Sequence, residues 1–204
     1  MKKLALTDFA KYRYPSALEL SPDGRYLTFA LKEVDSEGDG YRWNLWLYDL
    51  ERRESRQITR GNSQRQAVWE DNTHILYKTA EPDEALRARG FEEEWTVYHR
   101  LNVCTGEERE AFRLPMSVSG LWKMDEGRYV FTGETHLDRP NLLELTGEAL
   151  EKELVRRQQT RGYKVLTELP LCENGVGMFN QTRNTLFLYL EAAGEYRRIT
   201  PEDY

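Results

Sequence analysis

Two stretches of the chain carry nearly the same pattern, and this internal repeat constrains the fold more than any other feature. The same 141 positions separate Leu45 from Leu186 and Ile58 from Ile199. Residues identical in the two copies are Leu45, Leu47, Tyr48, Glu54, Arg56, Ile58 and Thr59, which correspond to Leu186, Leu188, Tyr189, Glu195, Arg197, Ile199 and Thr200. Trp46 corresponds to Phe187, which keeps an aromatic ring there. A match of this length indicates a structural unit that occurs more than once.

The repeated stretch has the pattern of an antiparallel hairpin. Residues 45–50 alternate, residues 51–54 form a polar turn, and residues 56–59 resume as a second strand. Upstream, Ser21-Pro22-Asp23-Gly24 is a turn sequence, because proline fixes φ and glycine accepts positive φ. It separates a short strand at 16–20 from a strand at 26–31. We therefore expect a meander of four strands over about residues 16–60.

Two further segments follow the same plan. The second covers about residues 64–115, and the third covers about residues 117–200 with a helical insertion at about 140–162. In the insertion, Thr146 is placed to cap a helix. The residues expected on its inner face are Leu150, Leu154 and Val155, and those expected outside are Lys152, Arg156 and Arg157.

Four strands in roughly 40–50 residues is the usual size of a β-propeller blade. A sandwich offers no reason for a repeated four-strand unit, and a parallel solenoid has shorter repeats. The predicted fold class is therefore all-β: an incomplete β-propeller of three four-stranded antiparallel blades with one helical insertion, in a single partial domain over residues 1–204. A closed propeller ring has about 4–8 blades, so three blades cannot form one. We expect a piece of a longer protein that carries the remaining blades, with self-association through open blade edges; three blades closed by oligomerisation is the alternative.

Composition narrows the class of protein. A net charge of −6 and a pI near 5.3 argue against a phosphate-binding surface, so no nucleic-acid partner is expected. Met1-Lys2-Lys3 begins like an export signal, but the apolar run after it is shorter than the ~7–15 residues required, and no run reaches the ~18 of a membrane span. The cytoplasm is the predicted location, without a membrane partner. Cys104 and Cys172 have no spacing typical of a metal site or a disulfide, and are predicted to be buried, unpaired thiols.

Several motifs together resemble the N-terminal propeller of the prolyl oligopeptidase family of serine peptidases, nearest its acylaminoacyl-peptidase branch. The motifs are Leu6-Thr7-Asp8-Phe9, Tyr14-Pro15-Ser16, Ser21-Pro22-Asp23-Gly24-Arg25-Tyr26, Asn44-Leu45-Trp46-Leu47-Tyr48-Asp49 with Gln57-Ile58-Thr59, Glu168-Leu169-Pro170, and Glu173-Asn174-Gly175-Val176-Gly177 before Arg183-Asn184. The likeness covers nearly the whole chain. The Ser-Pro-Asp-Gly motif is shared with TolB-type propellers, and the later motifs favour the peptidases.

The resemblance implies a propeller that caps an α/β-hydrolase domain and admits only short or unstructured peptides to its catalytic serine, aspartate and histidine. None of those catalytic positions can be assigned here, because the nucleophile elbow needs Gly-x-Ser-x-Gly. Gly61-Asn62-Ser63-Gln64-Arg65 lacks the second glycine, and Ser119-Gly120 lacks the first. His74, His99 and His136 have no partner that the sequence reveals. The prediction is therefore that these 204 residues hold no catalytic triad.

The remaining constellations are weaker. Relatives of the dipeptidyl-peptidase type use paired propeller glutamates to hold a free α-amine, and Glu92-Glu93-Glu94 offers such a group, although a solvated acidic run is the favoured interpretation. Asp35 to Gly40 imitates half of a calcium loop, but Trp46 stands where the bidentate glutamate belongs. Gly175-x-Gly177 has no helix after it to cradle a phosphate. We predict no cofactor and no metal.

Two functional hypotheses follow from the sequence. The first is the propeller part of a cytoplasmic serine peptidase for short peptides, of acylaminoacyl- or oligopeptidase type, which gates access and has an α/β-hydrolase domain and further blades as its partners. The second is a non-enzymatic TolB-like propeller that binds proteins. Substrate preference, blade total, oligomeric state and any contact of Glu92–Glu94 with substrate are left open by the sequence.

Overall fold

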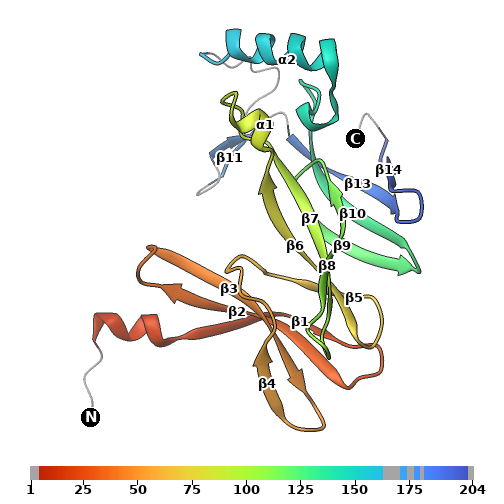
Figure 1. The fold of residues 1–204 in the computed structure, drawn as a ribbon. Helices are drawn as coiled ribbons and strands as arrows, with labels where there is room; N and C mark the ends of the chain where they lie inside the picture. The colour runs from red at the N-terminus through yellow and green to blue at the C-terminus, as the bar shows by residue number, and fades with distance from the viewer. Residues whose placement is uncertain (1–4, 163–170, 174–176, 180–181, 202–204) are drawn as a thin grey trace. The chain divides into compact units, whose positions relative to one another are not determined.

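The computed structural model describes residues 5–162, 171–173, 177–179 and 182–201. Within these residues the chain forms three four-stranded sheets, each a run of neighbouring hairpins, and one two-stranded hairpin (Figure 1). The predicted fold class, an incomplete β-propeller of three four-stranded antiparallel blades with a helical insertion, is confirmed.

The first sheet has the order β1-β2-β3-β4. Its strands are β1 (Arg13–Leu20), β2 (Tyr26–Asp35), β3 (Gly40–Asp49) and β4 (Glu54–Gln57), preceded by the 3₁₀ helix η1 (Leu6–Lys11). Its first turn forms as expected, with Gly24 at φ 73° and the Ser21 hydroxyl donating to Asp23 Oδ1 at 2.6 Å. The predicted strand at 16–20 begins earlier, at Arg13, because the register shifts between Ser16 and Glu19 and lets the strand continue past this irregularity.

The second sheet has the order β5-β6-β7-β8. Its strands are β5 (Ala67–Trp69), β6 (His74–Pro82), β7 (Glu94–Asn102) and β8 (Glu108–Leu114). The connection between β6 and β7 carries a single helical turn, α1 (Glu84–Arg87). Asp83 caps it, accepting a hydrogen bond from the Leu86 amide at 3.0 Å.

The third sheet has the order β9-β10-β13-β14. Its strands are β9 (Val118–Asp125), β10 (Arg128–His136), β13 (Thr182–Leu190) and β14 (Glu195–Arg198). The insertion between β10 and β13 holds η2 (Leu142–Glu144), α2 (Gly147–Gln159) and the hairpin of β11 (Leu171–Glu173) and β12 (Gly177–Phe179). The motif at 168–170 and most of the Gly175-x-Gly177 loop lie outside the described residues.

The chain divides into two compact units. The first comprises the residues up to Thr79 with Val97–Arg113 and Lys123–Gly127, and the second comprises Ala80–Thr96, Leu114–Trp122 and the residues from Arg128 onward. Buried residues of the first unit form one cluster, made of Ala30, Leu45, Leu47, Ala67, Trp69, Ile75, Tyr77, Leu101 and Val103. It joins the first sheet to the second, as packing between blades requires.

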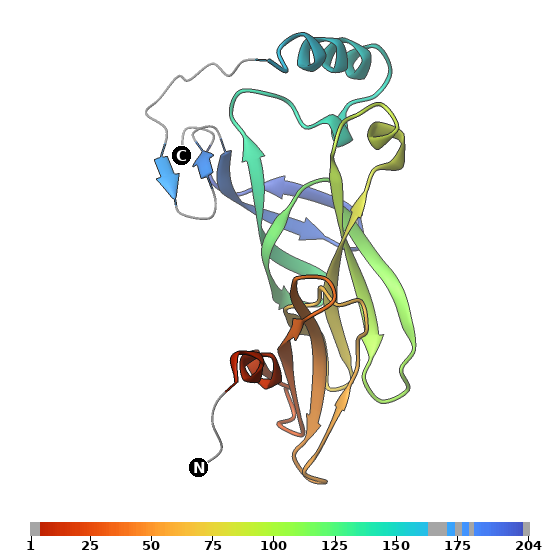
Figure 2. The ribbon, with the colours of Figure 1, turned by 90° about the vertical axis from the view of Figure 1, so that its left-hand side faces the viewer.

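The second unit has a small apolar cluster around its helices. Leu86 of α1, Leu142 of η2 and Leu154 of α2 are buried together, and α1 and α2 lie side by side in both views (Figure 1, Figure 2). Thr146 is the N-cap residue of α2 as predicted, but its side chain makes no capping hydrogen bond. Val155, expected on the inner face, is exposed, because Leu150 and Leu154 are four residues apart and share the face that meets the cluster, whereas Val155 lies further round the helix.

Candidate functional site

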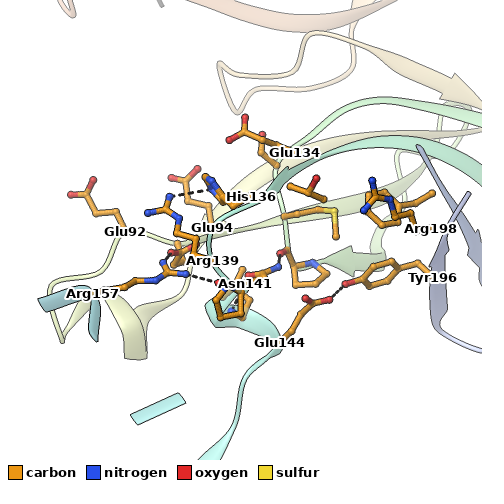
Figure 3. A pocket seen from close by; sticks show the side chains of 18 residues that line it. Glu92, Glu94, Glu134, His136, Arg139, Asn141, Glu144, Arg157, Tyr196 and Arg198 are labelled. Atoms are coloured by element: carbon orange, nitrogen blue, oxygen red, sulfur yellow. Dashed lines mark hydrogen bonds and ion pairs between the residues drawn. The ribbon is translucent and has the colours of Figure 1, made fainter. Parts of the chain in front are cut away.

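A cavity of ≈ 710 Å³ opens in the second unit (Figure 3). Its size is within the range of about 300–1,000 Å³ usual for small-ligand pockets. The end of β10 and the connections that follow β6, β8 and β10 line it, together with the first residue of β7 and with η2, α2, β13 and β14. The lining residues are Glu92, Glu93, Glu94, Pro115, Met116, Ser117, Glu134, Thr135, His136, Arg139, Pro140, Asn141, Leu143, Glu144, Arg157, Phe187, Tyr196 and Arg198.

Arg157 of α2 connects the segments that form one wall of this cavity. Its Nη1 donates to Glu93 Oε1 at 2.7 Å, and its Nη2 donates to the Pro140 carbonyl at 2.6 Å. Its Nε donates to Glu153 Oε1 at 3.0 Å, and only 11% of the side chain is exposed. The prediction that Arg157 lies outside, in solvent, is therefore wrong. A rigid guanidinium fork can join three segments in this way, which a lysine cannot.

The buried Glu153 explains the position of Arg157. Hydrogen bonds from Arg156 and Arg157 lower the pKa of Glu153 against the opposing effect of its partial burial. The carboxylate therefore stays ionised and holds Arg157 against the cavity wall. The spacing of four residues between Glu153 and Arg157 is a helical ion-pair signal that the sequence does contain.

A second pair, His136 and Arg139, stands on the same side of the cavity (Figure 3). Nη2 of Arg139 lies 3.1 Å from Nε2 of His136. Since a guanidinium only donates, Nε2 accepts and the imidazole proton is on Nδ1. Desolvation and the neighbouring Arg139 charge lower the pKa of His136 below its ordinary value, so the ring is neutral near neutral pH.

An aromatic wall closes the opposite side. The Tyr196 hydroxyl donates to the Glu144 carboxylate, and burial and that carboxylate raise the pKa of Tyr196 well above its ordinary value. The Tyr196 ring meets Phe187 edge to face, with centroids 5.6 Å apart. Met116 reaches this wall because Gly133 has no side chain: a Cβ there would lie 2.4 Å from the Met116 sulfur.

The structure divides the glutamate triplet. Glu93 is bound by Arg157, whereas Glu92 and Glu94 are exposed and line the cavity with Glu134. Within the described part of the chain, these three carboxylates have no hydrogen bond or ion pair. The cavity therefore offers carboxyl oxygens on exposed side chains and arginines in its walls, an arrangement suited to a polar, zwitterionic ligand such as a short peptide.

The structure gives the histidines partners that the sequence did not reveal. His74 Nδ1 lies 2.9 Å from Asp71 Oδ2, and His99 lies between Thr79 Oγ1, 3.0 Å from its Nε2, and Glu108, 3.5 Å from its Nδ1. The His99 cluster has the hydroxyl–imidazole–carboxylate order of a hydrolase triad. However, Thr79 belongs to β6 and not to a strand-to-helix turn, and His99 stacks on Tyr77 with centroids 5.3 Å apart. It is a polar cluster across neighbouring strands.

The other sequence candidates do not line the cavity. Ser63 accepts a hydrogen bond from the side-chain amide of Gln64 at 3.2 Å. Ser119 belongs to β9 and bonds to the Thr132 hydroxyl at 2.6 Å within the third sheet. Neither serine therefore stands on the strand-to-helix turn of a nucleophile elbow. Asp35 Oδ1 accepts from the Gly38 amide at 3.2 Å and serves the turn. The described residues contain no group of three or more His, Cys, Asp or Glu that could hold a metal ion.

Cys104 corrects another prediction. The residue is a free, exposed cysteine and not a buried one, because it follows Asn102 in a turn at the end of β7. Cys172 belongs to β11, but its side chain lies outside the described part of the structure.

No helix among the described residues is long and apolar enough to cross a membrane.

Comparison with known proteins finds a similar fold in solved peptidase structures. No family model and no curated protein sequence matches the chain. An acylaminoacyl peptidase from Pyrococcus horikoshii is similar over 95% of this chain, with a TM-score of 0.63 and 12% identity. The AtxE2 isopeptidase is similar over 91%, with a TM-score of 0.51 and 15% identity, and the tricorn protease over 90%, with a TM-score of 0.52 and 11% identity.

The covered share of those proteins is much smaller. This chain spans 26% of the acylaminoacyl peptidase, 29% of the isopeptidase and 18% of the tricorn protease. Identities this low establish the fold alone. The likeness to acylaminoacyl peptidases predicted from the sequence is confirmed at that level.

Proposed function

We propose that the chain is the N-terminal propeller region of a cytoplasmic serine peptidase of the prolyl oligopeptidase family, acting on short or N-acylated peptides. Its role is to screen substrates on their way to an α/β-hydrolase domain. The catalytic serine, aspartate and histidine belong to that domain and not to these 204 residues. The partners are thus the hydrolase domain, further blades and short peptides.

One observation carries this proposal: the chain matches, over 95% of its length, about a quarter of an acylaminoacyl peptidase. A second structure of an acylaminoacyl peptidase, with a TM-score of 0.61 and 10% identity, holds Z-Gly-Gly-Phe-chloromethyl ketone, a blocked tripeptide. The mixed charges of the cavity in the second unit support a short peptide with free ends, whose ammonium and carboxylate groups the glutamates and arginines could bind. The net charge of −6 gives no support for a nucleic-acid partner.

The coding sequence after residue 204 tests the proposal first. We expect a Gly-x-Ser-x-Gly motif there, followed by an aspartate and a histidine. The full product should hydrolyse N-acetyl-alanine p-nitroanilide, and the 204-residue chain alone should not. Replacement of the elbow serine by alanine is the control. A reading frame without this motif would refute the peptidase and favour the TolB-like binding module.

Gating has a test of its own. The full protein should cleave a short acylated peptide but spare the same sequence inside a long unfolded polypeptide, and the hydrolase domain alone should lose that preference. Equal preference with and without the propeller would contradict a screening role while leaving the peptidase assignment intact.

A further inference from the structure

Two aromatic rings and two cations lie together at one end of the first sheet, in the first unit. Lys32 of β2 pairs with Trp43 of β3, and Val34 pairs with Tyr41, so these side chains project from one face of the sheet. Nζ of Lys32 lies over the Tyr41 ring, 3.6 Å from its centroid, and 5.4 Å from the centroid of Trp43. The guanidinium carbon of Arg65 lies over the Trp43 ring at 4.1 Å. We name these four residues the cationic patch: Lys32, Tyr41, Trp43 and Arg65.

Backbone hydrogen bonds fix the segment that carries Arg65. After β4 the chain returns along the start of β3, where the Trp43 amide donates to the Asn62 carbonyl at 3.1 Å. The Gln64 amide donates to the Trp43 carbonyl, also at 3.1 Å. The Asn62 amide donates to Oδ1 of the buried Asn44 at 3.1 Å, and the Asn44 side-chain amide donates to Asn62 Oδ1 at 3.0 Å. Arg65 therefore follows directly after a connection that is bonded to β3 at several points.

The rings hold the two cations without satisfying their N–H groups. Among the described residues, neither Lys32 nor Arg65 forms a hydrogen bond or an ion pair. Arg89, by contrast, forms two hydrogen bonds with the carboxylate of Glu151. Attraction to a ring face needs no acceptor atom, so the N–H groups that point away from the ring remain available. The cationic patch therefore presents unused donors at a fixed place, which lowers the cost of binding an anion.

Lys78 of β6 adds a further positive charge to this surrounding. The pKa of Lys78 is lowered, first by its burial and then by the charge of Arg65. A carboxylate bound at the patch would relieve this repulsion between like charges. The long-range field of the chain opposes such binding, because the net charge is −6. Recognition of an anion here therefore has to come from the patch itself.

The position of the patch in the topology also favours a ligand site. The patch lies beside the turn between the second and third strands of its sheet and beside the connection that follows the fourth strand. In the second and third sheets, the corresponding connections are those after β6, β8 and β10, and they line the cavity of the second unit. Equivalent connections therefore contribute exposed glutamates to the cavity and cations to the first sheet.

We propose that the cationic patch is a docking site for an acidic segment of a polypeptide. Carboxylates of that segment accept hydrogen bonds from Lys32 and Arg65, and its chain lies against the Tyr41 ring. Tyr41 is 50% exposed and Arg65 is exposed, so both are open to a partner. A polypeptide fits better than a simple anion, because the cations flank apolar ring surface that a hydrated inorganic ion does not use. The inference does not depend on peptidase activity and would hold equally for a propeller that only binds proteins.

The test uses the 204-residue chain and the peptide N-acetyl-Gly-Glu-Gly-Glu-Gly-amide, in which only side chains are charged. The indole N–H signal of Trp43, assigned through Trp43→Phe, reports binding in an NMR titration. We expect a dissociation constant near or below about 1 mM at low salt, with weaker binding as salt is added. The double variant Lys32→Gln with Arg65→Gln should bind at least roughly 10-fold more weakly, since charge-assisted hydrogen bonds are lost.

Arg42→Gln is the matched control. Arg42 stands between Tyr41 and Trp43 on β3 and projects from the opposite face of the sheet. The substitution removes the same charge and should change the affinity by less than about 2-fold. Arg65→Gln alone, at an exposed position, should weaken binding at least roughly 3-fold and replaces the double variant if that variant fails to fold.

Three results would overturn the proposal. The first is equal weakening by Arg65→Gln and Arg42→Gln, because binding would then reflect overall charge. The second is a native chain that does not respond to the peptide, or responds equally to the same peptide with glutamine in place of glutamate. The third is an equal response to inorganic phosphate at matched ionic strength, because the patch would then be a site for simple anions.

Discussion

Arg157 shows how one side chain can determine the wall of a cavity. It binds Glu93, Glu153 and the Pro140 carbonyl at the same time, while Arg156 binds Glu153 from a side chain that is 48% exposed. The two arginines are therefore a matched pair with different burial.

Arg157→Lys is expected to destabilise the second unit by about 1–3 kcal/mol, because a lysine cannot replace the three charge-assisted bonds. Arg156→Lys should cost less, because the Arg156 side chain is 48% exposed and a lysine there still places a cation beside Glu153. Thermal unfolding of the two variants measures the difference. Equal costs would mean that the Arg157 contacts do not hold the wall together.

The second residue-scale prediction concerns the charge of His136. Desolvation and Arg139 lower its pKa, so the folded state holds a proton less tightly than the unfolded chain, where the value is near 6.5. His136 therefore lowers stability as the pH falls through about 6.5, and it has no such effect above that pH. An NMR titration should find His136 below its ordinary pKa, with Nε2 unprotonated in the neutral ring. Arg139→Gln should raise the pKa, Arg161→Gln should not, and an ordinary pKa in the native chain would contradict the Arg139 contact.

At the scale of elements, α2 depends on its contact with α1. Leu154 is 2% exposed and packs on Leu86, and the Arg89 guanidinium forms two hydrogen bonds with Glu151, at 2.6 and 2.7 Å. Leu154→Ala is expected to destabilise this helical cluster by about 2–5 kcal/mol. Hydrogen exchange should show the loss in the amides of α1 and α2. Val155→Ala, one residue further and exposed, should change exchange little; equal loss in both variants would show that the cluster does not stabilise α2.

The strands and their turns show what the sequence could predict. Hairpins such as β3-β4 are local: alternation fixes the two faces, and Asp49 accepts hydrogen bonds from the Glu51 and Arg52 amides at 3.0 Å in the turn. The repeat then predicts the same hairpin in the third sheet, as β13-β14. Such features depend on neighbours in sequence, and they were predicted correctly.

Contacts between distant segments were not predictable in this way. No sequence pattern near Glu93 predicts that Arg157, 64 positions later, binds it. The inner face of α2 is predicted from its apolar residues, but Glu153 and Arg157 lie there as a largely buried ion pair. The cavity is therefore the part of the molecule that periodicity could not reveal.

At the scale of the whole molecule, the partly exposed apolar face of the third sheet, formed by Val130, Leu186, Leu188 and Ile199, should govern the behaviour of the 204-residue chain in solution. Uncovered apolar surface promotes association, so the sedimentation coefficient should rise with concentration. Ile199→Glu, which places a charge in that face, should reduce the rise. Arg53→Glu, at an exposed turn with φ 59° next to β4, is the control and should not. A native chain that stays monomeric at high concentration would contradict this expectation.

The bond between Arg157 and Glu93 also has a consequence for sequence variation. Arg157 of α2 neutralises Glu93, the middle glutamate of three. The electrostatic field around the cavity therefore depends both on the insertion between β10 and β13 and on the connection between β6 and β7. Related chains that lose the insertion should also replace the central glutamate, since a bare carboxylate would add to the repulsion between its neighbours. Exchange of these two loops one at a time would then be less tolerated than their exchange together.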